Sequence, residues 1–107
     1  MTSSQKPAAP ENTEYSLEFN AKALKEWGKL DSTIRLQFAK KLKERLVNPR
    51  VEADKLRDMP NCYKIKLRAA GYRLVYDVVD QLLVVTVITV GKRERSKAYS
   101  TASRRID

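Results

Sequence analysis

The sequence predicts one α+β domain, in which two N-terminal helices pack on one face of an antiparallel sheet and a short C-terminal helix follows the last strand. Three observations support this fold class. Two amphipathic segments lie between residues 20 and 47, three strand-like segments with short connections lie between residues 62 and 90, and 42% of the 107 residues are hydrophobic. A chain of this length buries about 60–70% of the surface that it exposes when unfolded, which is enough for one core.

The first 14 residues are polar, contain Pro7 and Pro10, and include hardly any bulky apolar side chain. Such a segment cannot offset the entropy lost on ordering, so we expect residues 1–14 to be a flexible tail and residues 15–107 to be the folded domain. The domain begins with YSLEF, whose alternation predicts a strand with its apolar side chains on one side, those of Tyr15, Leu17 and Phe19.

Two helices are predicted next. Asn20 can cap the first helix, and Gly28 near its end favours an early stop. Asp31 or Ser32 can cap the second helix, and Pro49 ends it because a proline ring excludes helical geometry from the residue before it. The basic residues of this second helix are interpreted as an ordinary solvated face. Its apolar residues recur every four positions, at Ile34, Phe38, Leu42 and Leu46.

Residues 50–61 are predicted to form a connector with a short edge strand near residues 55–57. Three strands follow at residues 62–67, 72–79 and 82–90, and their short connections favour antiparallel hairpins. The last of these strands is an almost continuous run of Leu, Val, Ile and Thr, which is typical of a central strand covered on both faces. The final helix, capped by Ser96, is predicted from the helical spacing of Ala98, Tyr99, Ala102 and Ile106.

The distribution of charge predicts the kind of partner. Lys and Arg number 22 against 13 Asp and Glu, so the formal net charge is +9. Residues 1–61 hold 12 basic and 9 acidic side chains, whereas residues 62–107 hold 10 basic and 4 acidic ones. Clustered positive charge steers phosphates toward a protein, so the sequence favours a polyanionic partner that binds the second half of the chain.

Composition excludes several classes of site and location. With no His and a single Cys, Cys62, the chain has almost no ligands for structural zinc and cannot form an intramolecular disulfide. We therefore expect no metal, no cofactor and a cytoplasmic protein, with Cys62 in a structural role. The N-terminal residues lack the apolar core of a signal peptide, and the longest apolar run is too short to span a bilayer, so no membrane association is expected.

Alternation along residues 62–67 predicts a cationic face. If Tyr63 and Ile65 pack beneath the helices, Lys64 and Lys66 must point the opposite way, and Arg73 shares their side when the hairpin pairs in the matching register. A solvated sheet face is the alternative interpretation. A phosphodiester gathers negative charge when it is attacked, so clustered cations suit such a substrate. In the absence of histidine, a lysine can act as the base if neighbouring cations lower its pKa.

From Tyr15 to the C-terminus the chain resembles the RelE family of bacterial toxins, which are ribosome-dependent messenger-RNA endonucleases of type II toxin-antitoxin modules. The stretches ALKEWGKLDSTIR, NPRVEADKLRDMPNCYKIKLRAAGYRLVY and VITVGKRERSKAY carry the resemblance. It implies a compact fold related to microbial ribonucleases. It also implies cleavage of messenger RNA in the ribosomal A site, by attack of a 2′-hydroxyl on the adjacent phosphate.

The resemblance implies roles for the residues at matching positions. Lys64 would be the general base on the 2′-hydroxyl, and Lys66 would stabilise the charged phosphorane. Arg73 would hold the phosphate, and Arg93 would act as the acid for the leaving 5′-oxygen or stabilise it. Tyr99 would stack on or orient the nucleotide that is cut. Further RNA contacts are expected from Arg57, Lys92 and Arg95.

The resemblance also implies partners. A RelB-like antitoxin would wrap the basic domain, the ribosome and messenger RNA would be the target, and operator DNA would be reached only through the antitoxin. Two alternatives remain open: a ParE-like toxin of the same fold that poisons DNA gyrase, and an RNA-binding protein without chemistry. The joint presence of the four cations of the expected site counts against the gyrase alternative.

Overall fold

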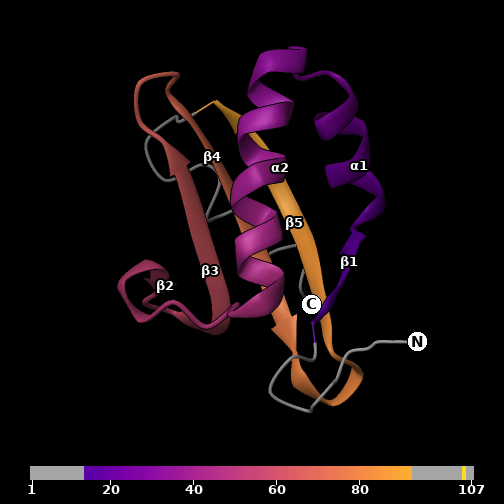
Figure 1. Cartoon of the computed structure of the whole chain (residues 1–107), viewed down its shortest axis with the longest axis vertical. Coiled ribbons are helices and arrows are strands. Elements are labelled where there is room, and N and C mark those ends of the chain that lie inside the picture. Colours follow the sequence, from indigo (N-terminus) through magenta and orange to yellow (C-terminus); the bar gives the residue numbers. More distant parts are fainter. Residues whose placement is uncertain (1–13, 93–104, 106–107) are drawn as a thin grey trace, which may run out of the picture.

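The computed structural model describes residues 14–92 and residue 105. The described chain forms a five-stranded sheet and two α-helices, and the strand order across the sheet is β1-β5-β4-β3-β2 (Figure 1). Two short 3-10 helices, Glu52–Asp54 and Asp80–Leu82, precede β2 and β5. The main elements are β1 (Ser16–Phe19), α1 (Ala21–Gly28), α2 (Ser32–Val47), β2 (Lys55–Leu56), β3 (Met59–Leu67), β4 (Tyr72–Val79) and β5 (Val84–Lys92).

Both helices begin at the side-chain caps that the sequence predicts. The Asn20 side chain accepts a hydrogen bond of 2.9 Å from the backbone N–H of Lys22, and Asp31 accepts one of 3.3 Å from that of Thr33. Each cap satisfies a backbone donor that has no partner inside the helix. The second helix stops at Val47, directly before the Asn-Pro pair, as expected from the proline.

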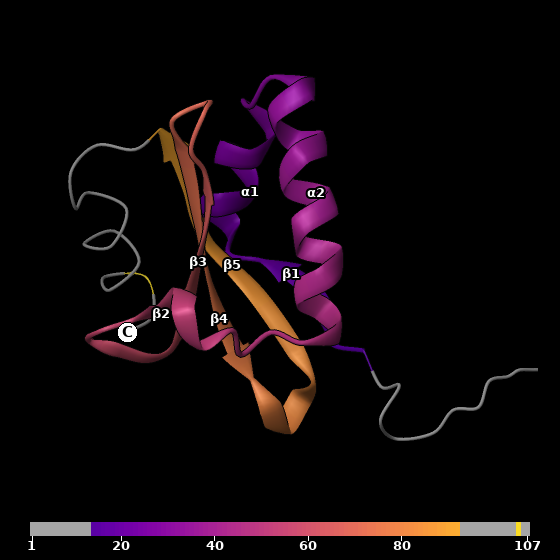
Figure 2. The same cartoon turned by 60° about the vertical axis from the view of Figure 1, so that its left-hand side comes forward.

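The two helices cover the same face of the sheet, which Figure 2 shows nearly edge-on with α1 and α2 on one side. Helix α1 lies against β5, and α2 lies against β3. The core between the layers is closed by buried side chains, among them Phe38 and Leu42 of α2 and Tyr63, Ile65 and Leu67 of β3. The predicted inward side of β3 is therefore confirmed, and its alternate residues must face away from the helices.

The sheet is mixed. Strands β2 to β5 are antiparallel neighbours, as the short connections predict, but β1 pairs parallel with β5, with Ser16 opposite Val84 and Phe19 opposite Val87. The apolar strand β5 is an interior strand, while β4 occupies the middle of the sheet. A parallel neighbour from the start of the chain leaves no turn signal, because both helices and three other strands lie between β1 and β5 in the sequence.

Two strands begin away from their predicted positions. Strand β3 begins at Met59 and includes Pro60, because Met59 pairs with Leu56 in a hairpin that starts earlier than residue 62. Strand β5 begins at Val84, since residues 80–82 form a 3-10 turn and Leu83 takes the left-handed conformation with φ of 53°. The sequence misleads here because a leucine in a left-handed turn position is uncommon.

The face opposite the helices carries a second, smaller apolar cluster. Strand β2 and its turn lie on that side of the sheet (Figure 2). The interpretation of this face as freely cationic is therefore wrong in part, because its middle is packed against β2. The cluster is formed by the buried residues Leu56, Cys62, Val75 and Ile88, with Met59 packed against them.

Some expectations fall on residues outside the described range. These are the flexible tail, apart from residue 14, and the final helix from Ser96, of which only Arg105 is described, as a helical residue. Among the helices of residues 14–92, none is long and apolar enough to cross a membrane.

We expect Phe38→Ala to lower the free energy of unfolding by about 3–5 kcal/mol, since it leaves a cavity at a fully buried position between α2 and the sheet. The matched control is Leu36→Ala on the same helix, where the side chain is 60% exposed and the change should stay within about 0.5 kcal/mol. Urea unfolding followed by circular dichroism measures both. Equal losses for the two variants would contradict this core.

Candidate functional site

The register of the β3–β4 hairpin brings the expected cations together. Lys66 lies directly opposite Arg73, and Arg73 lies opposite Gly91 on the other side of β4. Lys64 is two residues from Lys66 on the same strand, and side chains two apart along a strand share a face. The hairpin therefore pairs in the register that the sequence analysis required for Arg73 to share the side of Lys64 and Lys66. All three side chains lie on the face opposite the helices.

These cations are not an ordinary solvated surface. Arg73 is only 6% exposed, and Lys64 and Lys66 are half-buried. Moving a positive charge out of water costs free energy, so a cation on an open, solvated face stays exposed. The burial of Arg73 therefore counts against the solvated-face alternative at this position.

A cleft of about 330 Å³ lies beside Lys64, formed by β2, the following turn and the start of β3. Arg57 of the turn lines this cleft together with Lys64, so the structure brings an expected RNA contact next to the expected general base. Lys55 adds a third cation, and Asp58 is the one carboxylate among the lining residues. The arrangement suits a phosphate or a nucleotide at the mouth of the cleft.

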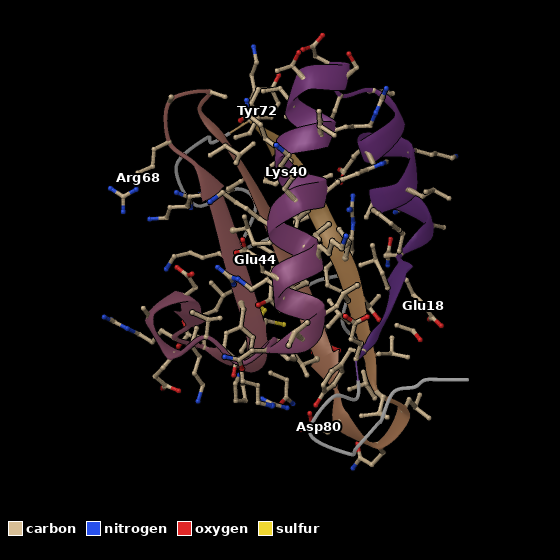
Figure 3. The ribbon with its side chains drawn as sticks, viewed as in Figure 1. Glu18, Lys40, Glu44, Arg68, Tyr72 and Asp80 are labelled. Carbon is tan, nitrogen blue, oxygen red and sulfur yellow. The ribbon has the colours of Figure 1, made fainter. Side chains whose placement is uncertain are left out.

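A second, polar cleft of about 240 Å³ joins Lys64 to helix α2, and a third of about 390 Å³ continues it toward the β3–β4 turn. Both are lined by Lys41, Lys66 and Arg68, so they form one cationic groove along the outer edge of β3. Figure 3 shows Arg68 extending outward from this end of the hairpin, while Lys40 and Glu44 lie on the outer face of α2.

The sequence analysis did not predict that residues of α2 line this groove. Lys41 and Arg45 were grouped with the solvated face, yet both line the polar cleft. The signal was available in the spacing, because positions 41 and 45 are one turn apart and adjoin the buried Leu42 on the helix surface. A basic pair at the border of the apolar stripe lies where α2 meets the sheet edge.

Cys62 does not have the properties of a nucleophile. The side chain is 1% exposed, and the thiol donates a hydrogen bond of 3.6 Å to the Asp77 carboxylate. Burial, together with the charge of Asp77 and this hydrogen bond, raises the pKa of the Cys62 thiol to about 12. The group is a thiol at neutral pH, and this agrees with the structural role expected from the sequence.

The C-terminal part of the expected site lies mostly outside the described residues. Lys92 is described, as the exposed last residue of β5 opposite Tyr72, but Arg93, Arg95 and Tyr99 are not. Within residues 14–92 and residue 105, no group of three or more Cys, Asp or Glu side chains could hold a metal ion.

Arg105 is attached to helix α1. Its guanidinium donates to both carboxylate oxygens of Glu26, each at 3.1 Å, and to the carbonyl of Ile88 at 2.8 Å. Glu26 also accepts hydrogen bonds from the Thr89 hydroxyl and the Val90 N–H, both at 3.1 Å. Burial raises the pKa of the Glu26 carboxyl, but the hydrogen bonds from its partners outweigh this effect and lower the pKa below its ordinary value.

The chain is similar to known toxins. Residues 17–97 match the family described as the ParE toxin of the type II toxin-antitoxin system, parDE. The mRNA interferase toxin RelE of Escherichia coli (strain K12) is 64% identical over 92 residues, which are 86% of this chain and 97% of that protein. The chain belongs to the RelE family of type II toxins.

Solved structures confirm the RelE-like fold. A double arginine-to-alanine mutant of E. coli RelE in the free state is 61% identical, with a TM-score of 0.82 and coverage of 88% of this chain and 99% of that one. A chain of the intact E. coli RelBE toxin-antitoxin complex is 64% identical, with a TM-score of 0.73 and coverage of 76% of this RelE-family chain and 99% of its own. The family and the α+β class expected from the sequence are both confirmed.

We expect Cys62 in the folded protein to react with a disulfide reagent at pH 8 at least about 100-fold more slowly than in urea, because the thiolate is the reactive form and burial disfavours it. Absorbance at the wavelength of the released thiol measures the rate. Reaction at the same rate in buffer and in urea would contradict the buried, protonated thiol.

The Glu26 ion pair predicts a pH dependence. Because the folded-state pKa of Glu26 is lowered, its stabilisation is fully present above the unfolded pKa and is lost as the pH falls through the folded pKa. Glu26→Gln should therefore lower the free energy of unfolding by about 1–3 kcal/mol at pH 7 and by less at pH 4. Thermal unfolding at both pH values tests this, and an equal difference at each would refute it.

Proposed function

We propose that this RelE-family toxin is an mRNA interferase that cuts messenger RNA in the ribosomal A site. The 2′-hydroxyl attacks the adjacent phosphate, and the products carry a 2′,3′-cyclic phosphate and a 5′-hydroxyl. The observation that supports this most is the pairing of Lys66 with Arg73 beside Lys64, in a chain that is 64% identical to a protein named as an mRNA interferase. The toxin domain spans residues 15–107.

The proposed chemistry is carried by cations. Lys64 removes the proton of the 2′-hydroxyl, Lys66 stabilises the charged phosphorane, and Arg73 holds the phosphate on the sheet face. Arg93 protonates or stabilises the leaving 5′-oxygen, and Tyr99 orients the nucleotide that is cut. Positive groups that are fixed before the reaction stabilise developing negative charge without reorganisation, which is a large contribution in a partly buried site.

The ribosome supplies what these residues lack. A lysine is an inefficient general base at neutral pH, because its amine is ordinarily protonated there. The reaction therefore depends on a message that is already bent for in-line attack. On this proposal the ribosome contributes orientation, and the protein contributes charge. The groove along β3 gives the RNA backbone a path of cations away from the reacting phosphate. Arg57, Lys92 and Arg95 hold the flanking nucleotides.

The proposed partners follow from the charge and from the relatives. A net charge of +9 fits an acidic antitoxin of the RelB kind, and a chain of the RelBE toxin-antitoxin complex is among the most similar structures. Contact with operator DNA is then made only through that antitoxin. The protein acts in the cytoplasm, where ribosomes and messenger RNA are found, and it has no membrane partner.

One alternative has support from a specific observation, because the matching family is described by the ParE toxin. A gyrase poison would damage DNA when it is overproduced, whereas an interferase would stop translation first. Incorporation of labelled methionine, measured beside a reporter of DNA damage, separates the two. Early DNA damage with continuing translation would refute the proposed function.

We expect the purified protein to cut message on programmed ribosomes and to leave free RNA almost intact. Lys64→Ala and Arg93→Ala should each slow single-turnover cleavage by about 10²–10⁴-fold, the usual contribution of an acid or base. Primer extension on ribosome-bound message maps and quantifies the cuts. Equal cutting of free and bound RNA would contradict the dependence on the ribosome.

The matched control for these variants is Lys40→Ala. This lysine is exposed on the outer face of α2, away from the cations of the sheet (Figure 3). Its removal lowers the net charge by the same amount as Lys64→Ala, and cleavage at saturating ribosome concentration should change less than about twofold. A loss as large as that of Lys64→Ala would show that total charge, and not position, decides the rate.

A further inference from the structure

Arg45 lies in the last turn of α2 and holds three separate elements with one guanidinium. Its Nη1 donates to the Tyr76 hydroxyl at 2.8 Å and to the Lys64 carbonyl at 3.3 Å, and its Nη2 forms an ion pair of 2.6 Å with Asp54. The side chain is 15% exposed, so it is largely withdrawn from water. A planar guanidinium with fixed donors places its partners more closely than an ammonium can.

The contact with Lys64 lies where the pairing between β2 and β3 ends. Strand β2 pairs with β3 only at Met59 and Tyr63, and within the described part of the chain no strand flanks the outer side of β3 beyond that point. Lys64 is the next residue after Tyr63. The guanidinium of Arg45 therefore donates to the backbone at the first residue past the end of the strand pairing.

The contact with Asp54 fixes the other wall of the cleft beside Lys64. Asp54 ends the 3-10 turn that leads directly into β2, and the residues that follow it, up to Met59, line that cleft. Arg57, the expected RNA contact, belongs to this segment. A single side chain thus joins the backbone under the expected general base to the segment that faces it across the cleft.

The contacts of Arg45 with Lys64 and Asp54 form the Arg45 joint, and the contact with Tyr76 holds this joint in place. The Tyr76 side chain is fully buried in the middle strand, and its hydroxyl donates to the carbonyl of Pro49 at 2.6 Å. The Arg45 guanidinium lies 5.8 Å from the centre of the Tyr76 ring, within the range of a cation–π contact. The position of Arg45 is therefore set by the core of the sheet.

We infer that Arg45 is a positioning residue for Lys64 and for the β2 segment opposite it. This inference rests on the proposed function of Lys64 as the general base. Arg45 reaches Lys64 through the backbone carbonyl from the helix side, while the Lys64 side chain leaves on the other face. Without the guanidinium contacts to the Lys64 carbonyl and to Asp54, Lys64 and the β2 segment can move relative to each other. Rates fall steeply when a reacting group is displaced by about 1 Å.

The chain offers a control in Arg50, a second arginine that follows α2 and contacts β3. Arg50 binds two elements: β3 through Tyr63 and Asn61, each at 3.2 Å, and the 3-10 helix before β5 through Asp80 at 2.7 Å. Its guanidinium lies 6.0 Å from the Tyr63 ring. The hydrogen bonds of Arg50 reach Asn61 and Tyr63 in the first half of β3 but not Lys64, so Arg50→Lys disturbs a second arginine network on the same strand.

The experiment compares Arg45→Lys, Asp54→Asn and Arg50→Lys. The two arginine variants keep the net charge, and Asp54→Asn changes it by one unit. At saturating programmed ribosomes we expect Arg45→Lys to slow single-turnover cleavage about tenfold and Asp54→Asn about threefold, with ribosome affinity unchanged within about twofold. Arg50→Lys should lose a similar amount of thermal stability and keep its rate within about twofold. Asp54→Asn keeps the test valid if Arg45→Lys does not fold.

A normal rate in Arg45→Lys, or the same loss in Arg50→Lys, would overturn the inference. Weaker ribosome binding with a normal saturated rate would also overturn it, because it would make Arg45 a direct RNA contact. Hydrogen exchange without ribosomes gives an independent result: residues 54–59 and 64–67 should exchange faster in Arg45→Lys than in Arg50→Lys, and equal exchange would refute the joint. If exchange behaves as expected but the unaltered protein leaves message intact, the proposed function fails and the joint stands.

Discussion

Packing of both helices on one face of the sheet is the constraint on which the other features depend. The buried side chains of Tyr63, Ile65 and Leu67 can be covered only from the helix side, so every second residue of β3 is forced onto the opposite face. Lys64 and Lys66 lie there for that reason. The same apolar contacts that hold the fold together thus decide where its positive charge gathers.

Two tyrosines connect this core to the polar groups around it. The rings of Tyr63 and Tyr76 stack with centroids 5.7 Å apart, and each hydroxyl accepts a hydrogen bond from an arginine at or just beyond the end of α2. A buried hydroxyl without a partner would cost free energy, and an arginine that extends along an apolar surface supplies the donor while its stem stays covered. Helix, linker and sheet are joined at these two points.

Most of the fold could be predicted from local patterns in the sequence. Contacts between side chains far apart along the chain could not be predicted from it. The alternation around Lys64 and the short connection to Arg73 depend on neighbours along the chain, so the shared face and its register could be predicted. The partners of Arg45 lie 9, 19 and 31 positions away, and no periodicity encodes them. Leu83 shows the opposite case, in which an apolar residue that reads as strand forms a left-handed turn.

The ion pair between Glu26 and Arg105 spans 79 positions of a 107-residue chain. During synthesis α1 is made early, and the segment that carries Arg105 follows only after all five strands. A nascent chain therefore has its helices and most of its sheet before it can close this contact. Among the described ion pairs, this one therefore closes last, onto a helix and a sheet that are already in place.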